Sequence, residues 1–137
     1  MFTISAKGLY GISAVIYLTE NYQSGSVQIK DISKQKDIPQ HYLEQLLVLL
    51  KRGGLVKSFR GAKGGYALAK SPSAITLLDV LEVLEGSLSL TRERTKPSQI
   101  DFVWEDLTLI IKNYLDITMD KLIDEIQKRG EQFIYTI

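Results

Sequence analysis

The sequence predicts a mainly α-helical protein that contains one small β-hairpin. Three observations lead to this fold class. Apolar residues recur at helical spacing over most of the 137 residues. Two short runs of strand-forming residues flank the glycine-rich segment 61–65. A regular apolar repeat over 100–117 indicates a further, long helix with one apolar seam.

The composition excludes several kinds of site. The chain has no cysteine and one histidine, His41, which excludes disulfides, cysteine-type zinc sites and cysteine-ligated iron–sulfur clusters. We therefore expect neither a metal nor another cofactor. No apolar stretch reaches the roughly 18 residues that a membrane span needs. The apolar segment 9–18 is expected to be an internal helix rather than a signal peptide, so we expect a cytoplasmic protein without a membrane partner.

Charge is distributed unevenly along the chain. Residues 1–70 contain ten Lys and Arg against four acids, a net charge of +6, whereas residues 71–137 contain seven against twelve, a net charge of −5. A basic half on a nearly neutral chain favours one end that binds a polyanion. The alternative is a chance clustering of solvated charges.

The first two predicted elements are helices. A helix over 5–21 puts Leu9, Ile12 and Ile16 on one face, and the polar segment 23–26 ends it. A short second helix has Ile29 and Ile32 on its inner face. It should stop near Asp37, because Pro39 disfavours a helical conformation at the residue before it.

Pro39 is expected in the first turn of a third helix, where its missing N–H is not needed. The pair Gly53-Gly54 should end this helix with a left-handed cap. Four leucines are expected to form its buried stripe: Leu43, Leu46, Leu47 and Leu50. The opposite face would carry Gln40, His41, Glu44 and Gln45, which is typical of a helix-turn-helix, although other small helical bundles share the pattern.

The hairpin follows directly. Strands are predicted over 55–60 and 66–70, and their glycine-rich connection keeps Arg60 and Lys63 near the tip. A basic hairpin after a helix-turn-helix is typical of a wing, which can lay an arginine into the minor groove of DNA. A nucleotide-phosphate loop is the alternative. It is disfavoured because no helix begins directly behind the loop and no Gly-Lys-Ser/Thr follows.

The second half should contain three helices. Thr76, with Asp79 three residues on, predicts a capping box, and Gly86 closes that helix, which buries Leu77, Val80, Leu81 and Leu84. A last helix is expected to begin at Thr118, to use Leu122, Ile123 and Ile126, and to end at Gly130. The predicted organisation is a winged helix-turn-helix domain over 1–86, a loop over 87–98, dimerisation helices over 99–130 and a C-terminal tail over 131–137.

The seam of the long helix predicts a dimer interface. Its apolar residues recur at spacings of 3 and 4 for nearly three heptads, and two more residues widen it. The predicted interface comprises Ile100, Val103, Trp104, Leu107, Ile110, Ile111, Tyr114 and Ile117. Packing within the monomer is the alternative explanation.

With these residues placed, the sequence resembles the Rrf2 (Rrf-two) family of bacterial repressors over essentially its whole length. The matching stretches are SAKGLYG at 5–11, HYLEQL at 41–46, GLVKS at 54–58, RGAKGGY at 60–66, EG at 85–86 and DIT at 116–118. The combination of YLEQL with RGxxGGY is highly specific. The resemblance implies a winged helix-turn-helix transcription repressor that binds duplex DNA as a homodimer.

The resemblance also implies roles for individual residues. Glu44 and Gln45 would read base edges, assisted by His41 and Tyr42, although Tyr42 can equally belong to the core. The wing would enter the minor groove through Arg60 and Gly61, with Lys63 at its tip. Phosphates would be held by Lys7, Tyr10, Lys57 and Ser58. These assignments suit the chemistry, because a carboxylate accepts from cytosine N4 and a glutamine can bond adenine twice.

One departure from the family pattern limits what the resemblance implies. Iron–sulfur members have three cysteines in the loop before the dimer helix, and residues 87–98 have none. The cysteine-free pattern is instead similar to the branch of cysteine-metabolism repressors. Their partner enzyme is O-acetylserine sulfhydrylase (cysteine synthase), and Tyr135 and Ile137 in the apolar ending would dock on it. The alternative is that this ending packs on the protein's own dimer.

Other functional classes compete with a repressor. An enzyme is disfavoured because no nucleophile–base pair is evident around the single histidine, so no catalytic residues are predicted. A protein-interaction module that has lost DNA binding, or a regulator of another regulon that senses a different signal, remains as an alternative.

Overall fold

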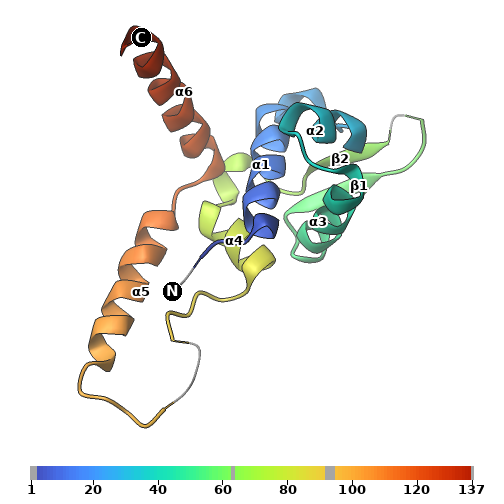
Figure 1. The fold of residues 1–137 in the computed structure, drawn as a ribbon. Coiled ribbons are helices and arrows are strands. Elements are labelled where there is room, and N and C mark those ends of the chain that lie inside the picture. Colours follow the sequence, from blue (N-terminus) through green and yellow to red (C-terminus); the bar gives the residue numbers. More distant parts are fainter. Residues whose placement is uncertain (1–2, 63, 92–94, 137) are drawn as a thin grey trace.

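The computed structural model describes residues 3–62, 64–91 and 95–136, and within these the chain forms six α-helices and one antiparallel hairpin. Figure 1 shows α1 to α4 and the hairpin gathered into one unit, with α5 and α6 on the side away from the hairpin. The elements are α1 (Ala6–Glu20), α2 (Ile29–Lys36), α3 (Gln40–Arg52), β1 (Val56–Phe59), β2 (Gly65–Leu68), α4 (Leu77–Glu85), α5 (Asp101–Leu115) and α6 (Met119–Thr136). Two single 3₁₀ turns, η1 (Tyr22–Ser24) and η2 (Pro72–Ala74), complete the order. The predicted mainly α-helical fold with a hairpin is confirmed.

The core lies between α1, α3 and α4. The four predicted leucines of α3 are all buried, together with Ile32 of α2 and Val80 of α4. Two glycines of α1 let α4 approach closely: a Cβ on Gly8 would lie 2.4 Å from Glu85 Oε1, and one on Gly11 would lie 2.1 Å from Leu84 Cδ1. These glycines therefore set the distance between α1 and α4.

Helix ends follow the local sequence closely. Thr76 accepts from the Asp79 amide, and the Asp79 carboxylate accepts from the Thr76 amide, so the predicted capping box is confirmed. The Leu55 amide donates to the Leu50 carbonyl, and the Gly54 amide donates to the Lys51 carbonyl. These two bonds form a Schellman motif at the end of α3, with Gly54 at a φ of +77°. The expectation for Pro39 was wrong by one position. It precedes α3 as the N-cap, with ψ at 129°, because its extended conformation closes the turn from α2.

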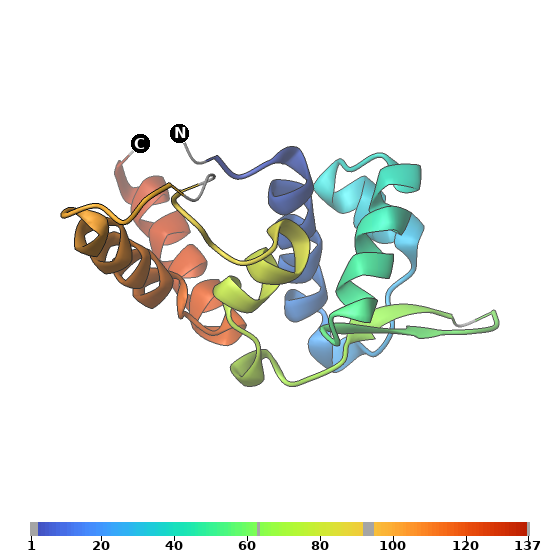
Figure 2. The same ribbon diagram turned by 90° about the horizontal axis from the view of Figure 1, so that it is seen from below.

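The hairpin is tied to the helical unit by a third short segment. The register of β1 and β2 pairs Val56 with Leu68 and Phe59 with Gly65. Val27 and Tyr66 exchange backbone hydrogen bonds of 2.8 Å, which joins the segment before α2 to β2. Figure 2 shows the hairpin projecting from this unit at the end opposite α5 and α6.

The last helix is longer than the sequence predicts. We expected it to end at Gly130, but α6 continues to Thr136, so the predicted end was wrong and the backbone of 131–136 is helical. A glycine inside a helix costs only about 1 kcal/mol relative to alanine, and no proline follows to stop the helix. At its start, Met119 is buried in the core and donates to Ile75, which anchors α6 to the domain.

Among the described residues, no helix combines the length and the apolar character that crossing a membrane would need.

Candidate nucleic-acid interface

The exposed face of α3 carries the residues that the sequence singled out. His41, Glu44 and Gln45 are exposed, opposite the buried leucine stripe. Within the part of the chain that the structure describes, the side chains of Glu44 and Gln45 have no hydrogen-bonding or ionic partner. Their donors and acceptors are therefore available to a ligand that lies along α3.

The turn before α3 sets the direction of this face. Asp37 adopts a left-handed conformation at a φ of 53°, and the following Ile38 is buried. The Ser33 hydroxyl donates to the Ile38 carbonyl at 2.5 Å, and the Ile38 amide donates to the Ser33 carbonyl at 3.0 Å. These contacts hold α2 and α3 in a compact helix-turn-helix, as the spacing of Asp37 and Pro39 predicts.

Tyr42 lies on the flank of α3 that faces α1. It is half-buried, packs against the core, and its ring meets that of Tyr10 edge to face. The sequence left Tyr42 open between core and site, and the ring belongs to the packing between α1 and α3. Lys7, one turn before Tyr10, is half-buried and lies near the Glu85 carboxylate.

The hairpin carries the second group of predicted residues. Arg60 and Gly61 are exposed, and Gly61 has a φ of +96°, a conformation that other residues rarely adopt. A glycine is also needed at position 65 for the hairpin to lie against the segment before α2, because a Cβ there would lie 2.4 Å from the Val27 carbonyl oxygen. Lys63, the predicted residue of the tip, lies outside the described residues.

The two residues of β1 that are predicted to bind phosphates, Lys57 and Ser58, each contact another side chain. Lys57 lies over the ring of Phe59, with its Nζ 5.5 Å from the ring centroid. The Ser58 hydroxyl accepts from Lys51 Nζ at 2.6 Å. Lys51, which joins the end of α3 to the hairpin, is not among the residues that the sequence predicts for the site. Its position seven residues after Glu44, on the same side of the helix, is the signal that could have found it.

Most of the predicted dimer seam lies on α5, which has no buried residue, but Ile100 is the N-cap of this helix and Ile117 follows its end, so the predicted helix over 100–117 was too long at both ends. Ile100, Val103, Trp104, Ile110 and Tyr114 are exposed, with Ile110 at 63% and Tyr114 at 82%. Leu107, Ile111 and Ile117 are half-buried, so they face the rest of the chain more than the prediction assumed. Phe102 and Leu109 are each 59% exposed as well, but they were not predicted for the interface because they lie outside the repeat of 3 and 4.

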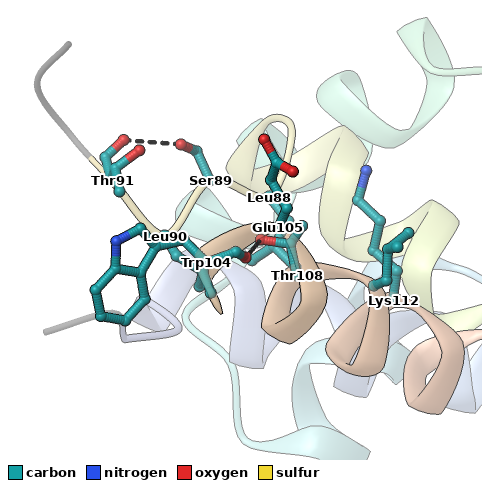
Figure 3. A pocket seen from close by; sticks show the side chains of 9 residues that line it. Leu88, Ser89, Leu90, Thr91, Trp104, Glu105, Thr108 and Lys112 are labelled. Atoms are coloured by element: carbon teal, nitrogen blue, oxygen red, sulfur yellow. Dashed lines mark hydrogen bonds between the residues drawn. The ribbon is translucent and has the colours of Figure 1, made fainter. Parts of the chain in front are cut away.

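The segment after α4 runs beside α5 and forms an open groove of about 390 Å³. Figure 3 shows side chains from both sides of it, including Trp104, Thr108 and Lys112 of α5. Ser89 donates to the Thr91 carbonyl at 2.8 Å on the opposite wall. The residues here do not fit an iron–sulfur cluster, because the chain has no cysteine, and no group of three or more metal-ligand side chains occurs among the described residues.

The two residues predicted to dock on a partner enzyme lie at the end of the sequence. Tyr135 lies in the last turns of α6, and Ile137 lies outside the described residues. The backbone of 131–136, which the sequence analysis places in a C-terminal tail over 131–137, is helical and belongs to α6.

The sequence of this chain is similar to those of known transcriptional regulators. The profile of the Rrf2 family, described as an iron-dependent transcriptional regulator, matches residues 4–125. The HTH-type transcriptional regulator CymR of Bacillus subtilis is 36% identical over 137 residues, which cover 98% of this chain and 99% of CymR. The regulator IscR of Escherichia coli is 33% identical over 129 residues, 88% of this chain and 80% of IscR.

Solved structures agree as well. That of CymR, the global cysteine regulator of B. subtilis, has a TM-score of 0.82 at 38% identity and covers 91% of this chain and 98% of CymR. The structure of T. potens IscR has a TM-score of 0.80 at 37% identity and covers 93% of this chain and 90% of the IscR chain. The chain therefore belongs to the Rrf2 family and is a DNA-binding transcriptional regulator with a winged helix-turn-helix fold, not an enzyme.

Proposed function

We propose that the protein is a homodimeric, sequence-specific transcription repressor that acts in the cytoplasm. It would place α3 in the major groove of duplex DNA and the tip of the hairpin in the adjacent minor groove. The observation that carries this proposal is the exposed pair Glu44 and Gln45 on α3, whose side chains have no partner among the described residues, together with a hairpin that presents Arg60. Free polar groups that face solvent from a rigid helix are what base reading requires.

Each predicted residue has a chemical role in this arrangement. Glu44 would accept from cytosine N4, and Gln45 would bond adenine at N6 and N7. Arg60 would enter the minor groove, where the absence of a Cβ on Gly61 allows close backbone approach. The residues proposed to hold phosphates or to support the contact are Lys7, Tyr10, His41, Tyr42, Lys57, Ser58 and Lys63.

The test separates base reading from phosphate binding. Glu44→Ala and Gln45→Ala should each relax the base preference, at about 1–3 kcal/mol for the position read. Lys57→Ala is the matched control, because it should weaken all sequences alike and flatten the salt dependence by about one unit. Affinities for an operator and its single-base variants measure the base preference, and repeating them at several salt concentrations measures the salt dependence. An unaltered base preference in Glu44→Ala would overturn the assignment of α3.

The dimer part of the proposal rests on α5 and α6. A large apolar surface on α5 is exposed in the single chain, and burying it against a second copy would remove that surface from water. Figure 1 shows α6 extending away from the domain, and we propose that this helix also contacts the second copy. Two linked domains would then grip two half-sites at once, and occupancy of a promoter would block transcription.

We also propose that the regulated genes serve cysteine or sulfur metabolism, without an iron–sulfur cluster. The similarity to a global cysteine regulator over nearly the whole chain supports this regulon. The absence of cysteine supports a signal other than a cluster. O-acetylserine sulfhydrylase is the proposed partner, docked through Tyr135 and Ile137. Sequencing the DNA fragments that the protein retains from its own genome tests the regulon, and fragments from unrelated promoters would reject it.

A further inference from the structure

A half-exposed apolar side chain interrupts the polar face of α3. Val48 is 48% exposed and is not among the residues that pack against the core. It lies one turn after Glu44 and Gln45, and by the helical repeat it shares its face with His41, Gln45 and Arg52. Valine is a poorer helix former than alanine, so neither helix stability nor core packing explains it.

The charges around Val48 indicate which partner covers it. Arg52 lies one turn further along α3, and Lys51 is held toward the hairpin by its bond to Ser58. Lys57 adds a third positive charge on β1. An apolar side chain with cations in the next turn of its helix and on the following strand suits a groove flanked by phosphates, because lysines and arginines can meet the DNA backbone beside it.

We propose that Val48 is a specificity-determining residue that contacts the C5-methyl group of a thymine in the major groove. The inference rests on the proposed placement of α3. Thymine is the base that presents an apolar group in this groove, and a short, stiff, branched side chain suits a contact close to the helix backbone. Four residues of helix span about 6 Å, so this thymine should lie roughly two base pairs from the cytosine that Glu44 is proposed to read.

The experiment replaces each thymine of the operator in turn with deoxyuridine, which removes the methyl group and leaves every hydrogen-bonding group. The full-length protein is compared with Val48→Ala, which should fold because alanine favours a helix. Leu9→Ala removes another exposed apolar side chain, from α1, and is the matched control. Thermal melting confirms that the variants fold.

At one thymine of each half-site, deoxyuridine should weaken binding by the unsubstituted protein about fourfold per half-site. Leu9→Ala should keep this penalty, and Val48→Ala should lose it. The same set of penalties in Val48→Ala as in the unsubstituted protein would overturn the inference, as would a uniform loss of affinity without loss of thymine preference. Failure of the proposed function would look different, because no salt-sensitive, sequence-selective binding would be found for any of the proteins.

Discussion

The rings of Tyr10 and Tyr42 meet edge to face, with their centroids 5.6 Å apart and their planes inclined at 77°. This contact joins α1 to the first turn of α3, so it fixes where α3 begins relative to the core. Such a pair contributes about 0.5–1.5 kcal/mol beyond the area that it buries. Tyr42 therefore has a structural role whatever its hydroxyl binds.

The two roles of Tyr42 can be separated by substitution. Tyr42→Phe keeps the ring, so the free energy of unfolding should change by less than about 0.5 kcal/mol. Removal of the hydroxyl should weaken operator binding by about 1 kcal/mol, the net value of one hydrogen bond. Tyr42→Ala should lower stability as well. Urea unfolding and operator titration measure the two effects, and unchanged binding by Tyr42→Phe would leave Tyr42 as a core residue only.

The dimer should depend on α5. Ile110→Asp places a charge on a residue that is exposed in the single chain, so the monomer should fold while dimerisation and operator binding fall together. Leu107→Asp should also destabilise the monomer, because Leu107 is half-buried. Asn113→Asp adds the same charge to α5 outside the seam and is the control. Sedimentation that shows intact dimers of both seam variants would put the interface elsewhere.

Glu85 should make a small, pH-dependent contribution to stability. The hydroxyl and the amide of Ser5 donate to its Oε1 at 2.6 and 2.9 Å, and the Ser5 hydroxyl is the main cause of a lowered pKa, with Lys7 nearby adding to it. A carboxyl whose pKa is lower in the folded state stabilises the protein above the unfolded pKa, near 4.5. That contribution is lost as the pH falls through the folded pKa.

The test compares the protein with Glu85→Gln by urea unfolding at pH 7 and at pH 3. Glu85 is exposed, so the difference at pH 7 should be at most about 1 kcal/mol and should shrink at pH 3. A stability difference that is equal at both pH values would mean that the charge of Glu85 is not what matters.

Operator binding should not respond to iron. The purified protein should show no cluster absorbance, and its affinity should be the same in air, without oxygen and after treatment with a chelator, because the chain has no cysteine to ligate a cluster. Stoichiometric iron together with an iron-dependent affinity would refute this.

Binding to O-acetylserine sulfhydrylase should depend on the last residues of the sequence. Deletion of Ile137 should abolish binding to O-acetylserine sulfhydrylase if the side chain of Ile137 occupies its active site. O-acetylserine should compete with the full-length protein in the same titration. Equal binding by the truncated protein, or no competition, would leave the ending as part of the protein's own packing.

The sequence by itself determined the elements whose signals are local. The leucine period of α3, the capping box at Thr76 and the glycine-rich hairpin each depend on neighbouring residues, so each was predicted correctly. The lack of cysteine excluded a cluster without any structure. Only the tertiary structure decided which apolar residues of α5 remain exposed, because burial depends on segments far away in the sequence. It likewise decided the contact of Lys51 with Ser58 and the continuation of α6 through Gly130, where a penalty of about 1 kcal/mol is too small to end a helix.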